Sequence, residues 1–170
     1  MISTIDEIPR LYHFTDKKNL PLIRELGGLL PRAELEKRDI KIPAPGGNEW
    51  SISADGWKNM DKYVHLCFRK NHPMEYVAKQ DSRISQSVFL EIKRDVLSIP
   101  GVLFTNDVAN KNGVEAVSID QANSMVDFEV LYTKTDWSDP AIKARLAQAE
   151  KYEVLVPAII PLNLIGMPDG

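Results

Sequence analysis

The chain lacks the features that mark several common classes of protein. Its 170 residues contain one cysteine, Cys67, which rules out an intramolecular disulfide and fits a reducing compartment. No Cys-x-x-Cys or His-Glu-x-x-His motif occurs, so the sequence predicts no metal site. A Walker loop and a Gly-x-Gly-x-x-Gly motif are also missing, which argues against a P-loop or Rossmann nucleotide site.

Neither an excess of positive charge nor a long apolar run is present. The formal net charge is −3, so no overall positive field draws the chain to nucleic acid, and any such contact needs a local patch. No stretch is apolar over the length of a membrane span, and Asp6 and Glu7 stand too early for a signal peptide. With 44% hydrophobic and 26% charged residues, the composition predicts one globular domain, residues 1–170, in the cytoplasm.

The order of predicted elements indicates an α+β fold, because strands and helices do not alternate regularly. One helix is expected to begin after Asp16 and to end at Gly27, a second follows Pro73, and Asp139 opens a third over residues 139–150. Residues 31–60 are rich in proline and glycine and are expected to form a long loop with a short helix at 32–39, a candidate mobile cover for a site. Strands are predicted at residues 10–15, 63–68, 87–93, 101–104, 128–133 and 152–157.

Two polar side chains stand out in the first predicted strand, Leu-Tyr-His-Phe-Thr-Asp at residues 11–16. His13 and Thr15 are two residues apart and therefore share a face of the strand. This pair suits hydrogen bonds to a ribose or an amide. The alternative is a histidine whose hydrogen bonds are satisfied by the backbone at the end of a strand.

A single carboxylate stands out in the last long strand, Tyr-Glu-Val-Leu-Val-Pro at residues 152–157. Glu153 is the acid of this otherwise apolar segment, and a buried acid is costly unless it has a partner or a task. Glu153 is therefore a candidate catalytic residue. The alternative is a solvent-facing glutamate on an edge strand.

The middle third of the chain is enriched in basic residues and aromatic rings. Together they suit a groove for single-stranded nucleic acid, in which bases stack on aromatic rings and cations contact phosphates. The alternative is a solvated surface above ordinary core aromatics. Cys67 is a further candidate, as a nucleophile, although a lone cysteine in an apolar strand more often belongs to the core. The basic residues are Lys58, Lys62, Arg69, Lys70, Lys79, Arg83, Lys93 and Arg94, and the aromatic ones are Trp50, Trp57 and Tyr63.

Four segments resemble, in the same order, motifs of the DarT family of DNA ADP-ribosyltransferase toxins. The first is residues 11–29, which begin with the motif that carries His13 and Thr15. The second is Tyr-Val-His-Leu-Cys-Phe at residues 63–68, followed by Pro73 and Met74. The third is Phe-Thr-Asn-Asp-Val-Ala at residues 104–109, and the fourth is the strand of Glu153 with Ile-Pro-Leu at 160–162. Together they span almost the whole chain.

The resemblance implies an ADP-ribosyltransferase fold, which is a split, mixed β-sheet with flanking helices and with NAD in the cleft between its halves. It also implies that NAD is the co-substrate, without a metal, and that ADP-ribose is attached to a base of single-stranded DNA. Such toxins are held in check by an antitoxin protein that removes the mark or binds the toxin. Carried over by motif, the resemblance makes Glu153 the catalytic acid and assigns the NAD site to His13, Thr15, Asn19, Leu20 and Phe68.

One departure from the family pattern concerns the acceptor base. Thymidine-modifying members carry an arginine-rich segment before the central strand, and one of its arginines assists catalysis. Residues 46–62 hold Lys58 and Lys62 but no arginine, and lysine cannot reproduce a bidentate guanidinium. Lys58 is the candidate replacement, and the departure favours guanine over thymine. The alternatives are an RNA or protein acceptor, and a catalytically degenerate NAD-binding module.

Overall fold

The structure is a computed structural model of the whole chain. It describes residues 8–40, 62–70, 72–80, 84–107, 116–132 and 138–167. Lys58, Trp50 and Trp57, and most of the long loop predicted at 31–60, lie outside these residues. Within the described part of the chain, no helix combines the length and the apolar character that crossing a bilayer requires.

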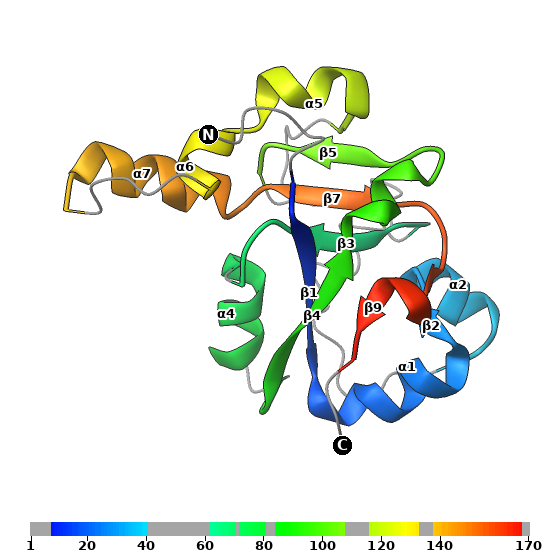
Figure 1. Cartoon of the computed structure of the whole chain (residues 1–170). Helices are drawn as coiled ribbons and strands as arrows, with labels where there is room; N and C mark the ends of the chain where they lie inside the picture. The colour runs from blue at the N-terminus through cyan, green and yellow to red at the C-terminus, as the bar shows by residue number, and fades with distance from the viewer. Residues whose placement is uncertain are drawn as a thin grey trace.

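The elements follow one another in an irregular order of strands and helices (Figure 1). The strands are β1 (Arg10–Asp16), β2 (Gly28–Leu29), β3 (Val64–Cys67), β4 (Ser87–Lys93), β5 (Leu103–Thr105), β6 (Val117–Ser118), β7 (Glu153–Val156), β8 (Ile160–Pro161) and β9 (Ile165–Gly166). The α-helices are α1 (Leu20–Leu26), α2 (Arg32–Lys37), α4 (Pro73–Gln80), α5 (Ile119–Met125), α6 (Phe128–Tyr132) and α7 (Pro140–Ala149). Short 3₁₀ helices are η2 (Lys17–Asn19), η4 (Arg94–Ser98) and η5 (Leu162–Leu164). The α+β class with flanking helices is confirmed.

Seven strands form one sheet in the order β6-β5-β7-β3-β1-β4-β9, and β2 pairs with β8 separately. The sheet is nearly split in its middle. Seven residue pairs join β1 to β4, whereas Tyr12 opposite Cys67 is the single pair recorded between β1 and β3. Figure 1 shows this divergence of the two halves: β1 and β4 run across the direction shared by β3, β7 and β5. The pairs that the described residues form are antiparallel.

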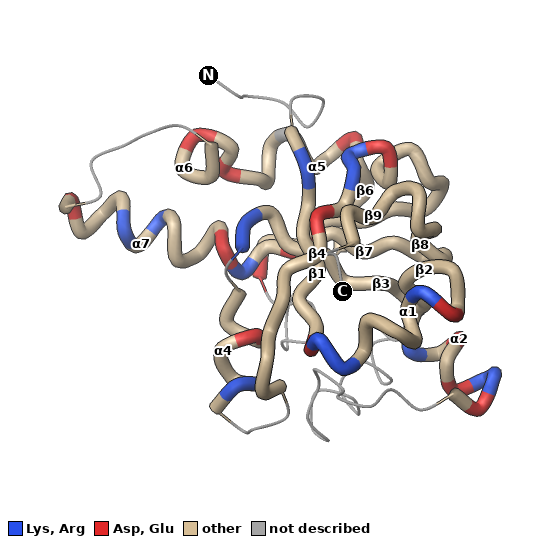
Figure 2. The backbone as a smooth tube through the Cα atoms, turned by 60° about the horizontal axis from the view of Figure 1, so that its bottom comes forward, with Lys and Arg blue, Asp and Glu red and all other residues tan. Residues whose placement is uncertain are grey.

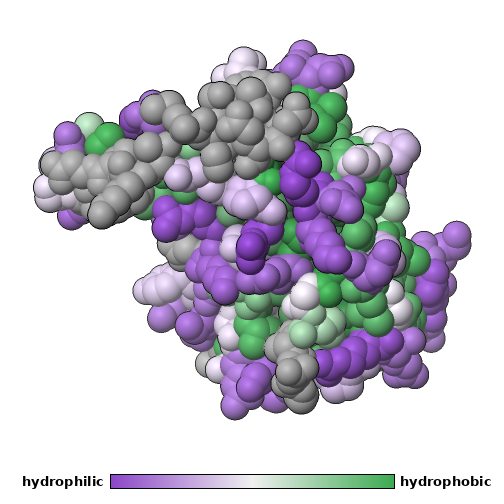
Figure 3. Space-filling model, in the orientation of Figure 1, coloured by the Kyte–Doolittle hydropathy of each residue, from purple (hydrophilic) through white to green (hydrophobic). Residues whose placement is uncertain are grey.

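The core lies around the central strands. Every residue of β7 is buried, including Glu153, because β3 and β5 flank this strand on its two edges. Among the described large hydrophobic residues, Tyr76 and Ile159 are the exposed ones. Hydrophilic residues accordingly form a band across the face shown in Figure 3, with smaller hydrophobic areas beside it.

Most elements predicted from the sequence are confirmed. The strands expected at 10–15, 63–68, 87–93, 101–104 and 152–157 correspond to β1, β3, β4, β5 and β7, and the helices expected after Asp16, at 32–39, after Pro73 and at 139–150 correspond to α1, α2, α4 and α7.

The strand predicted at 128–133 is wrong, because Phe128–Tyr132 forms the helix α6. Its aromatic and β-branched residues favour a strand, but the side chain of Asp127 accepts a hydrogen bond from the N–H of Val130 at 3.2 Å and caps the helix. Arg145 of α7 then holds the same carboxylate through two hydrogen bonds of 2.9 Å.

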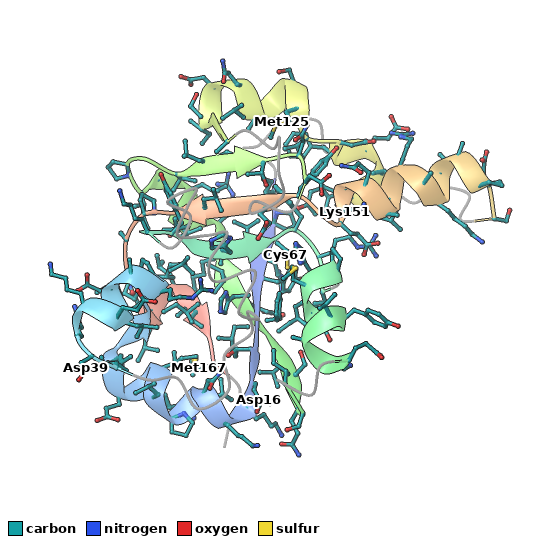
Figure 4. The ribbon with its side chains drawn as sticks, turned by 180° about the vertical axis from the view of Figure 1, so that it is seen from behind. Asp16, Asp39, Cys67, Met125, Lys151 and Met167 are labelled. Carbon is teal, nitrogen blue, oxygen red and sulfur yellow. The ribbon has the colours of Figure 1, made fainter. Side chains whose placement is uncertain are left out.

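Two residues turn the chain at the ends of α1. Gly27 ends the helix in the left-handed conformation, with φ of 81°, and a Cβ on the next residue, Gly28, would collide with the carbonyl of Ile160. Asp16 is fully buried at the end of β1 (Figure 4) and caps the turn that leads into the helix. Its carboxylate accepts hydrogen bonds from the N–H groups of Lys18 (2.9 Å), Ser85 (2.8 Å) and Gln86 (3.2 Å). Asp16 therefore joins the start of α1 to the segment that enters β4.

Replacement of Asp16 is predicted to destabilise the fold in a pH-dependent manner. The hydrogen bond from Lys18, together with those from Ser85 and Gln86, holds the pKa of Asp16 below its usual value. The stabilisation is therefore complete above the ordinary aspartate pKa of about 3.9 and is lost as the pH falls towards the lowered folded-state pKa. Asp16→Ala should reduce the free energy of unfolding by about 3 kcal/mol at pH 7.

Urea denaturation of the wild type and Asp16→Ala at pH 7 and at pH 3 measures this effect. We expect the difference between the two proteins to shrink at pH 3. A difference that is equal at both values would contradict the charged role of Asp16.

Candidate active site

The centre of the sheet brings an acid and a histidine together. Cys67 of β3 lies opposite Glu153 of β7, and His65 lies opposite Leu155, so His65 and Glu153 are diagonal neighbours on one face. The His65 Nδ1 and Glu153 Oε1 atoms are 3.1 Å apart. The Glu153 side chain is 8% exposed and that of His65 is 25% exposed. The edge-strand alternative for Glu153 is therefore wrong, since β7 is central and its acid is buried with a partner.

The backbone of Glu153 is held from the other side, by β5. Thr105 lies opposite Glu153, and its Oγ1 accepts a hydrogen bond from the N–H of Glu153 at 3.2 Å. The same hydroxyl donates to the carbonyl of Asp107 at 2.7 Å. Because Thr105 is fully buried, this connection is shielded from water. Thr105 thus ties the strand that carries the acid to the turn at residues 105–107.

His13 reaches the same region from β1. Its Nδ1 lies 2.9 Å from the backbone carbonyl oxygen of His65, and because a carbonyl can only accept, Nδ1 carries the proton and donates. Burial lowers the pKa of His13 below its usual value, so the ring is neutral and keeps its lone pair on Nε2. The alternative interpretation of His13 predicted such a backbone contact. The contact joins His13 of β1 to β3, the strand that pairs with the strand of Glu153.

Thr15 and Asn19, predicted for the same site as His13, lie together. The Asn19 Nδ2 atom donates to Thr15 Oγ1 at 2.9 Å, and both side chains are buried. Leu20 and Phe68 instead belong to the hydrophobic core, where the Phe68 ring packs edge-on against Tyr152 with centroids 6.4 Å apart. The structure thus brings His13 to the strand next to Glu153 and pairs Thr15 with Asn19.

The structure favours the core interpretation of Cys67. Figure 4 shows this residue where β1 passes β3. Its thiol donates to the carbonyl groups of Tyr12 (3.5 Å) and Arg69 (3.2 Å). Burial, together with the nearby charge of Glu153, raises the pKa of the Cys67 thiol far above its usual value. A thiolate nucleophile is therefore disfavoured at this position.

Two histidines near the acid were not singled out from the sequence, His65 and His72. His72 is buried, stacks on the ring of Phe14 with centroids 6.0 Å apart, and accepts a hydrogen bond from the N–H of Met74 at 3.2 Å. Burial lowers the pKa of His72, and the charge of Glu153 opposes that shift. The sequence signal that could have found His65 was its place two residues before Cys67, on the same face of a predicted strand.

Several basic residues of the middle third contact acidic or aromatic side chains. Lys70 lies 5.7 Å above the ring of Tyr12 and 3.9 Å from a carboxylate oxygen of Glu91, and Lys79 pairs with Glu75 at 3.5 Å. In Figure 2 positive and negative residues alternate over the described backbone. Lys58 and Arg83 lie outside the described residues. No group of three His, Cys, Asp or Glu side chains in the described ranges is arranged to hold a metal ion.

Comparison with known proteins shows which family the chain resembles. A protein-family model described as "ssDNA thymidine ADP-ribosyltransferase, DarT" matches residues 12–167. No curated protein sequence matches the chain significantly.

Solved structures of this kind share the fold. Thermus sp. 2.9 DarT in complex with ADP-ribosylated ssDNA gives a TM-score of 0.70 at 17% identity, covering 97% of this chain and 82% of that chain. The same protein in complex with NAD⁺ gives a TM-score of 0.62 at 20% identity, over 94% and 80% of the two chains. Thermosipho africanus DarTG in complex with ADP-ribose gives a TM-score of 0.67 at 18% identity, over 93% of this chain and 43% of that chain. At these identities the likeness establishes the fold.

Removing the Thr105 hydroxyl is predicted to loosen the strand of the acid. Thr105→Val keeps the shape of the side chain but removes the acceptor for the Glu153 N–H and the donor to Asp107. We expect a loss of about 1 kcal/mol in the free energy of unfolding. Thr105→Ser keeps the hydroxyl and is the matched control. An unfolding midpoint in urea for Thr105→Val equal to that of the wild type would show that the hydroxyl contributes nothing.

Proposed function

The chain belongs to the DarT family of single-stranded DNA ADP-ribosyltransferase toxins, and from that membership we propose that Glu153 is the carboxylate with which it transfers ADP-ribose from NAD⁺ to a DNA base. The enzyme is an NAD-dependent DNA ADP-ribosyltransferase. The observation that carries the proposal for Glu153 is a buried carboxylate on the interior strand β7, held 3.1 Å from His65 of β3, the strand that His13 contacts.

The chemistry of the transfer fits a carboxylate. Breaking the bond between the nicotinamide nitrogen and ribose C1′ sends the bonding electrons to that nitrogen, so nicotinamide leaves as a neutral molecule. Positive charge develops on the ribose, and a carboxylate beside it stabilises that charge. A ring or exocyclic nitrogen of the base then forms the new bond to C1′, and Glu153 accepts the proton that this nitrogen loses.

Residues of β1 and of the turn that follows it are proposed to bind NAD⁺. We propose that His13 uses Nε2, and Thr15 its hydroxyl, to contact the ribose and amide of the nicotinamide riboside. Asn19 acts by holding Thr15 through its 2.9 Å hydrogen bond. Leu20 and Phe68 lie in the hydrophobic core, and their contribution to the NAD⁺ site stays a prediction. Lys58 remains a prediction for the basic residue that assists catalysis, because it lies outside the described residues.

For the acceptor base we propose thymidine. The family model's own description names thymidine, whereas the preference for guanine that we expected from the missing arginine finds no support in the comparisons. Guanine is therefore an alternative outcome of the test below. We also propose an antitoxin as a protein partner, one that removes the mark or binds the toxin, because a related structure is of a DarTG protein.

Replacement of Glu153 is predicted to abolish transfer and to spare NAD⁺ binding. Glu153→Gln keeps the volume and a hydrogen-bonding side chain but removes the negative charge. We expect transfer to DNA to fall at least a thousandfold, consistent with the loss of an electrostatic contribution of about 4 kcal/mol, while the Kd for NAD⁺ changes less than threefold. Rates come from mass spectrometry of the DNA product. Activity equal to that of the wild type would remove Glu153 from the reaction.

Oligonucleotides that each lack one base are expected to identify the acceptor. With NAD⁺ and the wild-type enzyme, single-stranded DNA without thymine should gain no ADP-ribose, and the other oligonucleotides should gain it. Loss of product only without guanine would instead establish guanine. Modification of RNA or protein, with no oligonucleotide modified, would replace the DNA proposal by the second alternative. NAD⁺ binding without transfer to any acceptor would establish a degenerate binding module.

His13 is predicted to contribute to NAD⁺ affinity through Nε2. His13→Asn offers an amide in place of Nδ1 to the carbonyl of His65 but has no counterpart of Nε2. We expect the Kd for NAD⁺ to rise about tenfold, the effect of losing a hydrogen bond of about 1.4 kcal/mol. Isothermal titration calorimetry measures the Kd, and a thermal melt checks that the fold is retained. Unchanged affinity in a folded variant would reduce His13 to a structural residue.

A further inference from the structure

We propose that His65 is a positioning residue for the reaction: its imidazole fixes the orientation of the Glu153 carboxylate through the hydrogen bond between Nδ1 and Oε1. This inference rests on the proposed catalytic function of Glu153. None of the motif assignments made from the sequence gave His65 a role.

The register of two central strands creates the pair. Four consecutive residue pairs join β3 to β7, and they set His65 diagonally across from Glu153 at a separation that a long side chain spans. Both residues stand on strands rather than on loops, so the 3.1 Å contact has rigid supports on either side. Thr105 fixes the backbone of Glu153 from β5, and His65 fixes its carboxylate from β3.

The chemistry of the pair favours orientation of the acid. A carboxylate that is 8% exposed needs a donor, and with Glu153 ionised the Nδ1–H of His65 supplies one. An imidazole can donate from Nδ1 in both its neutral and its protonated state. The hydrogen bond therefore survives a change in the protonation of His65, and the carboxylate keeps one orientation before and during the transfer.

The other nearby histidine, His72, cannot fill this role in the same way. Its Nδ1 accepts from the N–H of Met74 at 3.2 Å and so carries no proton, and the side chain is buried against Phe14. Burial lowers the pKa of His72, which keeps its ring neutral. Of the two histidines near the acid, His65 is the one with a recorded hydrogen bond to the Glu153 carboxylate.

His65 makes two contacts, one through its side chain and one through its backbone, and a substitution affects only the first. Its side chain holds Glu153, whereas its backbone carbonyl accepts from His13 at 2.9 Å. A substitution at position 65 removes the first contact and leaves the second in place. The expected signature of His65 is therefore a fall in the rate of transfer with little change in NAD⁺ affinity.

Two variants of matched purpose test the proposal. His65→Leu removes the donor and keeps an apolar side chain suited to the strand, whereas His65→Asn places an amide N–H close to the position of Nδ1. We expect His65→Leu to lower the single-turnover rate of ADP-ribose transfer to single-stranded DNA at least tenfold, with the Kd for NAD⁺ within twofold of the wild type. His65→Asn should recover most of the lost rate. Urea denaturation of both variants shows whether either has lost stability.

A double-mutant cycle links the effect to the acid. In the Glu153→Gln background, where the carboxylate is already gone, His65→Leu should lower the residual rate less than twofold. The proposal is overturned if His65→Leu transfers at the wild-type rate, if the asparagine variant shows no recovery, or if the tenfold loss persists in the Glu153→Gln background. A wild-type enzyme that modifies no DNA overturns the proposed function itself, and is thereby distinguished from a failure of His65 alone.

Discussion

The structure depends on a buried carboxylate in the middle of its sheet. Glu153 occupies a strand whose every residue is buried, and an isolated charge at such a position is strongly unfavourable. His65 offsets part of this cost by contacting the carboxylate from β3, and Thr105 holds the backbone of Glu153 from β5. The position of the Glu153 side chain therefore depends on the register of three strands, β3, β7 and β5. A shift of that register would change the geometry of the proposed reaction.

The second constraint is the near-split between β1 and β3. With a single recorded residue pair, these strands diverge, and the hydrogen bond from His13 to the His65 carbonyl supplements that pair across the gap. On the far side, β1 is firmly paired to β4 along seven residues. His13 and Thr15 of the proposed NAD⁺ site thus stand on one well-paired half of the sheet, and the proposed catalytic acid stands on the other.

Much of this could be predicted from the sequence, because strand periodicity, helix caps and the isolated acid are local signals. The motif order further indicated the family to which the chain belongs. The contact between His65 and Glu153 could not be predicted, since it depends on the register of strands 88 residues apart. The strand expected at 128–133 failed for a related reason: local preference for a strand lost to the Asp127 cap and to Arg145 from another helix. The positions of Lys58 and of the predicted loop remain predictions.

The two contacts of position 65 have a consequence for how such a protein can diverge. A backbone carbonyl is present whatever the amino acid, so the anchor for His13 does not depend on which side chain occupies the position. The contact with the Glu153 carboxylate, in contrast, is made by the His65 side chain and depends on the amino acid at this position. A change of side chain at position 65 can therefore alter the contact with the proposed catalytic acid and leave the contact with His13 in place, so the two contacts can change separately in evolution.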